Sequence, residues 1–245
     1  PDVESLSDIR PEKKPDIRIV GSLKLNAVST PVDETFADQL RAAAGSRPIL
    51  LAASTHSPEE QILLEASQEV VRAGYPHLLI IAPRHSDRSQ DIARLMPQAA
   101  HRSKNQLPLL GDDHFLADSF GEMSSLVTAA DIVILGGSFV PKGGHNPLEI
   151  AALSTPLRTG PSQFKNKIEF DTLQQYGQCI TVKDGATLVK QLTIWLEALR
   201  TDGRAIPQDN LDKACAYVKQ ACERPSKTAR LIIDRLPTQH HPNQN

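Results

Sequence analysis

Short apolar runs alternate with amphipathic segments along most of the chain. The runs lie at residues 17–23, 48–54, 77–83, 131–137, 155–161 and 179–182, and they predict buried parallel strands. Between them, apolar residues at spacings of three and four predict helices at residues 32–44, 58–73, 87–95, 121–130, 147–153 and 164–176. This alternation indicates an α/β fold with a Rossmann-like, doubly wound parallel sheet. Ligands of such sheets bind at the carboxyl ends of the strands.

After Val182 the pattern changes to helices alone. They are predicted at residues 186–199, 211–223 and 226–236, where apolar positions again repeat every three or four residues. Residues 1–16 are polar and rich in proline, which is typical of a linker, and residues 237–245 are expected to be disordered. Residues 17–236 are therefore predicted to form one α/β domain followed by C-terminal helices.

Composition and charge exclude several classes of protein. A net charge of -2 with 40% hydrophobic residues describes an ordinary globular chain without the basic excess of a nucleic-acid-binding protein. The three cysteines have neither disulfide nor zinc-ligand spacing, which favours a reducing, cytosolic setting. We find no membrane-spanning run and no signal-peptide pattern.

The most informative stretch is GGSFVPKGGHNPLE, residues 136–149. It holds four of the chain's 13 glycines: Gly136, Gly137, Gly143 and Gly144. Glycines at a strand end let a ligand or a second backbone approach closely. Asn146, followed by Pro147 and then Glu149, has the pattern of a helix N-cap.

A glycine-rich loop that leads into a helix N-terminus presents amide N–H groups to an anion. We therefore predict an anionic ligand at this loop, although helix capping alone would equally explain the cap residues. The loop is neither a dinucleotide-binding fingerprint nor a nucleoside triphosphate loop, because their glycine spacings differ.

Three further predicted strands end in polar residues. The strand at 48–54 leads into Ser54, Thr55 and His56, the strand at 77–83 into Arg84 and His85, and a short run at 114–118 into Phe120, Gly121 and Glu122. Helix starts capped by Ser57, Ser86 and Ser119 would also explain this polarity. We favour ligand binding for Arg84, because its fixed positive charge suits a phosphate or a carboxylate.

Three histidines occupy predicted strand-to-helix junctions. His56, His85 and His145 share this placement and are expected to converge, whereas His77, His101 and His114 lack it. Their sequence spacing does not favour a metal site, and the sequence suggests no cofactor. Hydrogen bonds to a sugar, a carboxylate or a loop carbonyl are the preferred role.

Taken together, these motifs resemble the Kdo transferases of lipopolysaccharide synthesis, glycosyltransferases of the GT-B fold (Kdo is 3-deoxy-D-manno-octulosonic acid). The matching elements are Ser54-Thr55-His56-x-x-Glu59-Glu60, Pro83-Arg84-His85, Asp118-x-x-Gly121-Glu122 and the long glycine string, with Pro156 and Gly160-Pro161 after it. The glycine string is specific, and the other elements would be weak alone. Together they cover most of residues 17–161.

The resemblance implies transfer of Kdo from CMP-Kdo to a lipid A precursor, with inversion at the anomeric carbon and without a metal ion. In GT-B enzymes the C-terminal domain binds most of the donor nucleotide, and this chain matches that half. The resemblance therefore implies that residues 1–16 are a linker from a missing N-terminal domain. That domain would supply the catalytic base, the acceptor site and the membrane-associating surface, so this chain would bind donor without catalysing transfer. The intact enzyme would work at the cytoplasmic face of the bacterial inner membrane.

The resemblance also assigns roles to the candidate residues. Arg84 and the amides of residues 143–146 would face the phosphate or carboxylate of the donor, and Glu149 would accept hydrogen bonds from ribose hydroxyls. The remaining candidate donor contacts are Ser54, Thr55, His56, His85, Gly121, Glu122, Gly137, Gly143, Gly144, His145 and Asn146. Ser138 and Lys142 are lesser candidates. Phe120 stands where the family pattern has methionine, and it would stack on cytosine or fill a core gap.

Two alternatives remain at this stage. One is a GT-B relative, or an epimerase of similar fold, that uses another nucleotide-activated sugar. The other is a non-catalytic interaction module in which the glycine loop is only a tight connection.

Overall fold

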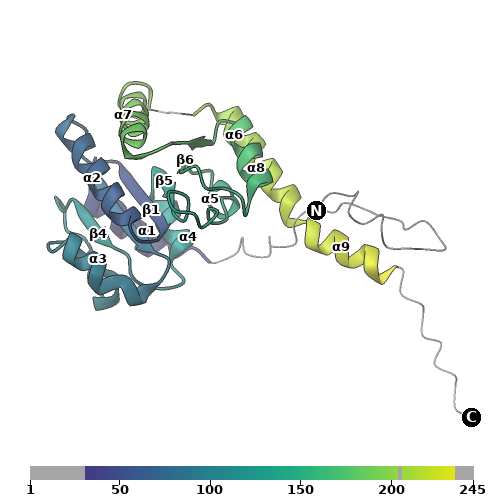
Figure 1. Ribbon diagram of the computed structural model, residues 1–245, viewed down its shortest axis with the longest axis horizontal. Helices are drawn as coiled ribbons and strands as arrows, with labels where there is room; N and C mark the ends of the chain where they lie inside the picture. The colour runs from purple at the N-terminus through teal and green to yellow at the C-terminus, as the bar shows by residue number, and fades with distance from the viewer. Residues whose placement is uncertain (1–30, 204–205, 235–245) are drawn as a thin grey trace, which may run out of the picture. The chain divides into compact units, whose positions relative to one another are not determined.

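The computed structural model describes residues 31–203 and 206–234. The chain forms two compact units. The first is residues 27–219, and the described part of the second is residues 220–234. The first unit is an α/β domain built on one parallel sheet (Figure 1). The predicted strand at 17–23, the linker and the tail lie outside the described residues, so the domain boundaries stay predictions.

Within the described residues, seven strands form the sheet in the order β3-β4-β2-β1-β5-β6-β7. They are β1 (Ile49–Thr55), β2 (Leu78–Pro83), β3 (Ala100–His101), β4 (His114–Leu116), β5 (Ile132–Leu135), β6 (Leu157–Thr159) and β7 (Cys179–Thr181). All neighbouring strands are parallel. The predicted doubly wound sheet is confirmed, with every described strand but β3 close to its predicted position.

Helices precede or separate the described strands along the chain, and the last three described helices follow β7, as the sequence predicted. They are α1 (Glu34–Ala44), α2 (Glu59–Arg72), α3 (Ser89–Leu95), α4 (Met123–Ala129), α5 (Leu148–Ala151), α6 (Lys167–Gln175), α7 (Gly185–Asp202), α8 (Gln208–Cys222) and α9 (Arg224–Ile233), with short 3-10 helices η2 (Ser86–Arg88) and η3 (Arg102–Lys104). The predicted helix at 164–176 begins three residues late, at Lys167, so Phe164 and Lys165 remain in a loop. None of the described helices is long and apolar enough to cross a membrane.

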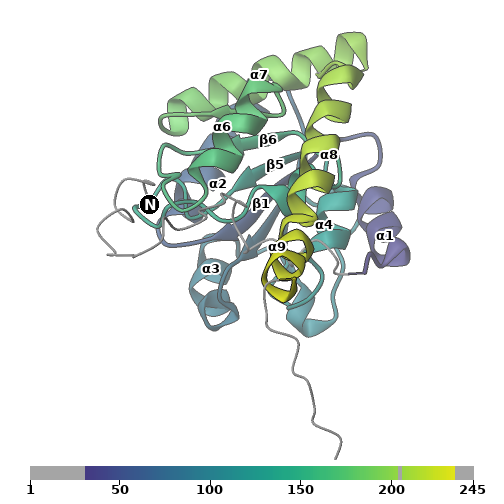
Figure 2. The same cartoon turned by 90° about the vertical axis from the view of Figure 1, so that its right-hand side faces the viewer.

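The central strands are buried on both faces. Leu50 and Ala52 of β1 join one apolar cluster with α2, α3 and α7, whose members include Trp195. The alternate residues Ile49 and Leu51 are also fully buried, and side chains alternate between the two faces of a strand. The opposite face is covered by other helices, among them α1 and α4, which lie side by side (Figure 2). Burial on both faces explains why the strands read as continuous apolar runs.

Candidate ligand site at the carboxyl edge

The chain reverses its direction of winding between β1 and β5. From β1 the sheet grows through β2 to β4 and β3 on one side, and through β5 to β6 and β7 on the other. Such a switch point opens a crevice at the carboxyl ends of the strands. The predicted site residues lie at the end of β1, in the loops after β1, β2, β4 and β5, and, for Glu149, in the first turn of α5.

A cavity of about 140 Å³ lies at this edge. Six of the predicted residues line it, from the end of β1, the loops after β2 and β4, and α5: Ser54, Arg84, Phe120, Gly121, Glu122 and Glu149. Ser54 has a left-handed backbone conformation, with φ +54°. Such a conformation in a residue other than glycine costs free energy and is common beside functional sites.

Arg84 and Glu149 are the two charged groups of this cavity that suit a ligand best. Arg84 is exposed after β2, and its backbone N–H donates to the carbonyl of Thr55. Among the described residues, no carboxylate forms an ion pair with its guanidinium. Glu149 is half-buried, and burial raises the pKa of its carboxyl, against the opposing effects of a hydrogen bond to Asn146 and of the charge on Arg84. The cavity therefore offers one cation and one desolvated hydrogen-bond acceptor.

The three predicted histidines converge, as expected. The Nε2 atoms of His56 and His145 are 2.9 Å apart, and the ring of His85 meets that of His56 edge to face at 5.8 Å between centroids. Burial lowers the pKa of His145 to about 4, with smaller contributions from His56 and Arg84. The pKa of His56 is also lowered, mainly by burial. Both rings are therefore neutral at pH 7, and one proton can be shared between their facing nitrogens.

Three histidines do not by themselves make a metal centre here. Within the described ranges, no group of three or more His, Cys, Asp or Glu residues is arranged to hold a metal ion. His77, which the sequence placed outside the site, is buried with its ring between the hydroxyl of Ser67 and the carbonyl of Tyr75.

The prediction that the glycine loop presents unpaired amides to an anion is wrong for most of the loop. The fully buried carboxylate of Glu59 accepts from the N–H groups of Gly137, Ser138 and Phe139 at 2.8 to 3.0 Å, and from that of His56 at 2.9 Å. We call this arrangement the Glu59 clamp. The amides of Gly137 and Ser138, two of the predicted ligand contacts, are thus occupied by a protein carboxylate.

In the second half of the loop, three backbone N–H groups also donate to acceptors within the protein. The N–H groups of Gly143, Gly144 and His145 donate to the hydroxyl of Ser162, the carbonyl of Gly137 and the carbonyl of Gly136. Asn146 precedes Pro147, which is the N-cap of the short helix α5, and its side chain accepts from the N–H of Leu148 at 3.1 Å. The side chain of Asn146 therefore bonds to the start of α5 without being its N-cap residue, and a ligand contact of this side chain stays a prediction.

Close backbone contact explains the glycines. A Cβ on Gly136 would lie 2.4 Å from the carbonyl oxygen of Ser54, and one on Gly144 would lie 2.9 Å from the ring of Phe170. The sequence allowed either a ligand or a second backbone to approach these glycines. The atoms that lie close to them in the structure belong to the protein's own backbone and side chains.

Two predicted contacts, Thr55 and Ser138, have hydrogen-bond partners within the protein. Thr55 is buried and donates to Glu60, which also forms an ion pair with Arg88 at 2.6 Å. Ser138 is fully buried, and its hydroxyl donates to the carbonyl of Leu135. The prediction that the side chains of Thr55 and Ser138 contact a ligand is therefore wrong, because both are buried and bonded within the protein.

Glu122 lines the cavity, but its carboxylate is engaged by Arg102 at 2.6 Å and by the hydroxyl of Ser119. Ser119 therefore serves Glu122 rather than capping α4, whose N-cap is Glu122 itself. Ser57 and Ser86 are likewise not helix N-caps, since α2 and α3 begin after Pro58 and Arg88.

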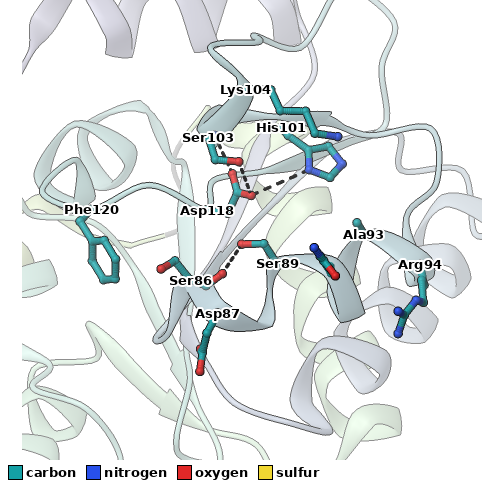
Figure 3. Close-up of a pocket in the computed structure, with 11 residues that line it drawn as sticks. Ser86, Asp87, Ser89, Ala93, Arg94, His101, Ser103, Lys104, Asp118 and Phe120 are labelled. Carbon is teal, nitrogen blue, oxygen red and sulfur yellow. Dashed lines mark hydrogen bonds and ion pairs between the residues drawn. The ribbon is translucent and has the colours of Figure 1, made fainter.

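A larger cavity of about 760 Å³, which the sequence did not predict, adjoins the first one at Phe120. Phe120 is 73% exposed and lines both. Figure 3 shows buried Asp118 held by Ser103 beside His101, with Ser86, Asp87 and Ser89 on the opposite wall. Most of the residues that line this cavity are polar, and the exposed aromatic ring of Phe120 lies at one end.

Sequence reasoning missed the structural roles of Glu59, Arg88 and Arg102. Each joins loops that are distant in the sequence, as when Glu59 meets residues about eighty positions away. The nearest signal in the sequence was the pair Glu59-Glu60 soon after a strand, which is also part of the family motif.

The chain is similar to proteins of known activity. It is 32% identical over 181 residues to the 3-deoxy-D-manno-octulosonic acid transferase of Rickettsia felis, covering 72% of this chain and 39% of that protein. It is 42% identical over 123 residues to the enzyme of the same name from Haemophilus influenzae, covering 48% of this chain and 29% of that one. The chain thus spans about two fifths or less of the length of these curated relatives. No protein-family model matches it.

The fold has a close counterpart among solved structures. The C-terminal CMP-Kdo binding domain of WaaA from Acinetobacter baumannii superimposes with a TM-score of 0.64 at 27% identity. The match covers 76% of this chain and 98% of that domain. The similarity therefore includes nearly the whole of a separately crystallised domain.

Proposed function

We propose, from the premise that this chain corresponds to the C-terminal half of a Kdo transferase, that it is the donor-binding domain of a glycosyltransferase that uses CMP-Kdo. The observation that carries the proposal is the cavity at the carboxyl edge, where Arg84 and Glu149 lie in a chain that matches a CMP-Kdo binding domain. The interaction-module alternative gives no reason for these two groups to share a cavity.

Each group suits one part of such a donor. The guanidinium of Arg84 would bind the phosphate or the sugar carboxylate, because planar N–H donors match these oxygens. The carboxylate of Glu149 would accept hydrogen bonds from ribose hydroxyls. Phe120 would stack on the pyrimidine ring, since its ring is exposed rather than in the core. The core-gap alternative for Phe120 is wrong.

The cavity beside Arg84 is too small to enclose the whole donor. Pockets that bind drug-sized ligands measure roughly 300 to 1,000 Å³, and the cavity beside Arg84 measures only about 140 Å³. A nucleotide sugar would extend past Phe120 toward the larger cavity or into the crevice. The neutral pair His56 and His145 borders that crevice and would bind through hydrogen bonds rather than charge.

The finer aspects of the reaction belong to the same proposal. We propose an inverting, metal-independent transfer to a lipid A precursor at the cytoplasmic face of the inner membrane. Residues that the relatives have beyond the matched region would supply the base and the acceptor site. This chain alone would bind donor without catalysing transfer.

A titration of this chain with CMP and with UMP tests the proposal. We expect CMP to bind more tightly than UMP. Arg84→Ala and Glu149→Gln should each weaken CMP binding by about 10- to 100-fold, since hydrogen bonds to charged groups contribute roughly 1.5 to 3 kcal/mol.

Matched controls lie far from the edge. Arg200→Ala in α7 and Glu65→Gln in α2 remove exposed residues of the same types and should leave CMP binding unchanged. Tighter binding of UMP than of CMP would favour a relative that uses another nucleotide sugar. Unchanged binding in both site variants would contradict the proposed site.

A further inference from the structure

An exposed surface of lysines and apolar side chains lies next to the glycine loop. Phe164 and Ile168 are 66% and 69% exposed, and Lys142, Lys165 and Lys167 around them are exposed too. We call these five residues the basic-apolar lip. They line neither of the two cavities described above.

Two segments far apart in the sequence build this lip. The N–H of Lys165 donates to the carbonyl of Gly143 at 3.2 Å, which joins the loop after β6 to the residue that follows Lys142. A Cβ on Gly143 would lie 2.7 Å from Cγ of Lys165 and 2.8 Å from the ring of Phe164. Glycine at this position therefore lets the two segments close against each other. Ile168 follows in the first turn of α6.

The charge of the lip is positive and largely uncompensated. In the described part of the chain, neither Lys142 nor Lys165 forms an ion pair with a carboxylate. Lys167 pairs with Asp171, but both side chains are exposed, and exposed pairs contribute little. Burial is the main reason that the pKa values of His56 and His145 are lowered, and the nearby charges of Lys142 and Lys165 add to the effect on His56 and His145 respectively.

We propose that the basic-apolar lip docks on the surface of a bilayer that contains anionic lipids. Phe164 and Ile168 would enter the interface between headgroups and acyl chains, and the lysines would contact the anionic headgroups. A protein partner fits this surface less well, because protein interfaces are depleted in lysine and enriched in arginine. Lysines also suit a lipid surface, since their long stems lie along apolar surface while the charge stays in water.

The inference goes beyond the proposed function and does not depend on nucleotide binding. If the proposed function holds, docking would bring the donor cavity close to a bilayer in which an amphiphilic acceptor would reside. It also differs from the expectation that only the rest of the intact enzyme contacts the membrane.

Flotation of this chain with lipid vesicles tests the proposal. We expect it to float with phosphatidylcholine vesicles that contain about one third phosphatidylglycerol, and not with phosphatidylcholine alone. Binding should weaken as salt is raised, because salt screens exposed charges. The double variant Lys142→Ala/Lys165→Ala should bind more than tenfold more weakly, given about fivefold for each lysine near an anionic surface.

A second pair of variants distinguishes binding through the basic-apolar lip from nonspecific binding through any exposed apolar side chain. Phe164→Ser/Ile168→Ser should lose flotation yet bind CMP as the unsubstituted chain does, and unchanged CMP binding would also show that the variant is folded. Leu109→Ser/Leu110→Ser removes side chains that are 73% and 77% exposed beside Asp112 and Asp113, and should float like the unsubstituted chain.

Three outcomes would overturn the proposal. The first is equal flotation with neutral and anionic vesicles, and the second is undiminished flotation of both lip variants. The third is absence of flotation of the unsubstituted chain, which would leave another protein segment as the occupant of the lip. A failure of CMP binding alone would contradict the proposed function and not this inference.

Discussion

At the residue scale, the Glu59 clamp holds the candidate site in shape. One carboxylate with no exposed surface accepts from four N–H groups, which belong to the loops after β1 and β5. A buried carboxylate with several good hydrogen bonds is stable in place, whereas a partly satisfied one is costly. The clamp therefore fixes the relative position of His56 and the glycine loop.

Glu59→Gln should lower the free energy of unfolding by about 2 to 4 kcal/mol. The amide keeps the shape of the side chain but turns one acceptor into an N–H₂ donor that faces backbone donors, so buried N–H groups lose their partner. Urea unfolding measures the change. Glu65→Gln, exposed on the same helix, is the control and should change stability by less than about 0.5 kcal/mol. An equally small effect of Glu59→Gln would contradict the clamp.

The sequence located charged groups better than it located their partners. Arg84 was predictable because a cation directly after a buried strand of a parallel sheet must lie at the carboxyl edge. The partners of Glu59, Glu60 and Glu122 were not predictable, because an acid in a first helical turn looks the same whether it faces solvent or a distant loop. Exposure of Phe120, which decides between stacking and core packing, was likewise visible only in three dimensions.

At the scale of elements, two glycines let backbones meet at the ends of the central strands. A Cβ on Gly136 would lie 2.4 Å from the carbonyl oxygen of Ser54, and one on Gly160 would lie 2.4 Å from that of Ser138. Neither obstacle is a flexible side chain, so no change of rotamer relieves the overlap.

Gly136→Ala and Gly160→Ala should each cost about 3 kcal/mol or more, because relief requires backbone segments to move apart. For Gly136 these are the end of β1 and the loop after β5, and for Gly160 they are the loops after β5 and β6. Gly203→Ala should cost only about 1 kcal/mol, since its positive φ, and not space, is the obstacle. Gly185→Ala, which meets only an ordinary contact at 3.4 Å, should be neutral or slightly stabilising. Thermal unfolding ranks the four variants, and a cost at Gly136 no greater than at Gly203 would contradict the argument.

Most elements were predictable because strands buried on both faces carry unbroken apolar runs, as in β1 and β2. Two-residue β3 has no such signal, since it pairs only at the sheet edge with β4. The start of α6 was misplaced for another reason. Phe164 looks like the first apolar position of a helix, but it lies in a loop against Gly143 and is exposed.

At the scale of the whole molecule, the free energy of unfolding is expected to fall as the pH is lowered. Burial lowers the pKa values of four described histidines, His56, His77, His114 and His145. Partners in the fold lower the pKa values of the carboxyls of Glu60, Asp118 and Glu122. In each case the unfolded chain takes up a proton at a higher pH than the folded chain, so acid favours unfolding. The raised pKa of Glu149 opposes this trend.

The histidine and carboxyl contributions fall in different pH ranges, which makes them separable. His145 is neutral in the folded chain down to about pH 4, while the unfolded residue takes up its proton near pH 6.5. Its contribution is therefore complete above pH 6.5, is lost as the pH falls toward 4, and changes no further below that. The three carboxyls lose theirs only as the pH falls below their ordinary values of 3.8 to 4.5.

We expect the free energy of unfolding to fall between pH 6.5 and pH 4, with His145 contributing about 1 to 2 kcal/mol. This is less than the shift alone would give, because solvent reaches part of the ring and screens it. Urea unfolding at several pH values in this range measures the slope, which His145→Gln should flatten while His85→Gln, at an exposed position, leaves most of it. An unchanged slope in His145→Gln would mean that the ring is more hydrated than the packing of His56 and the glycine loop against it implies.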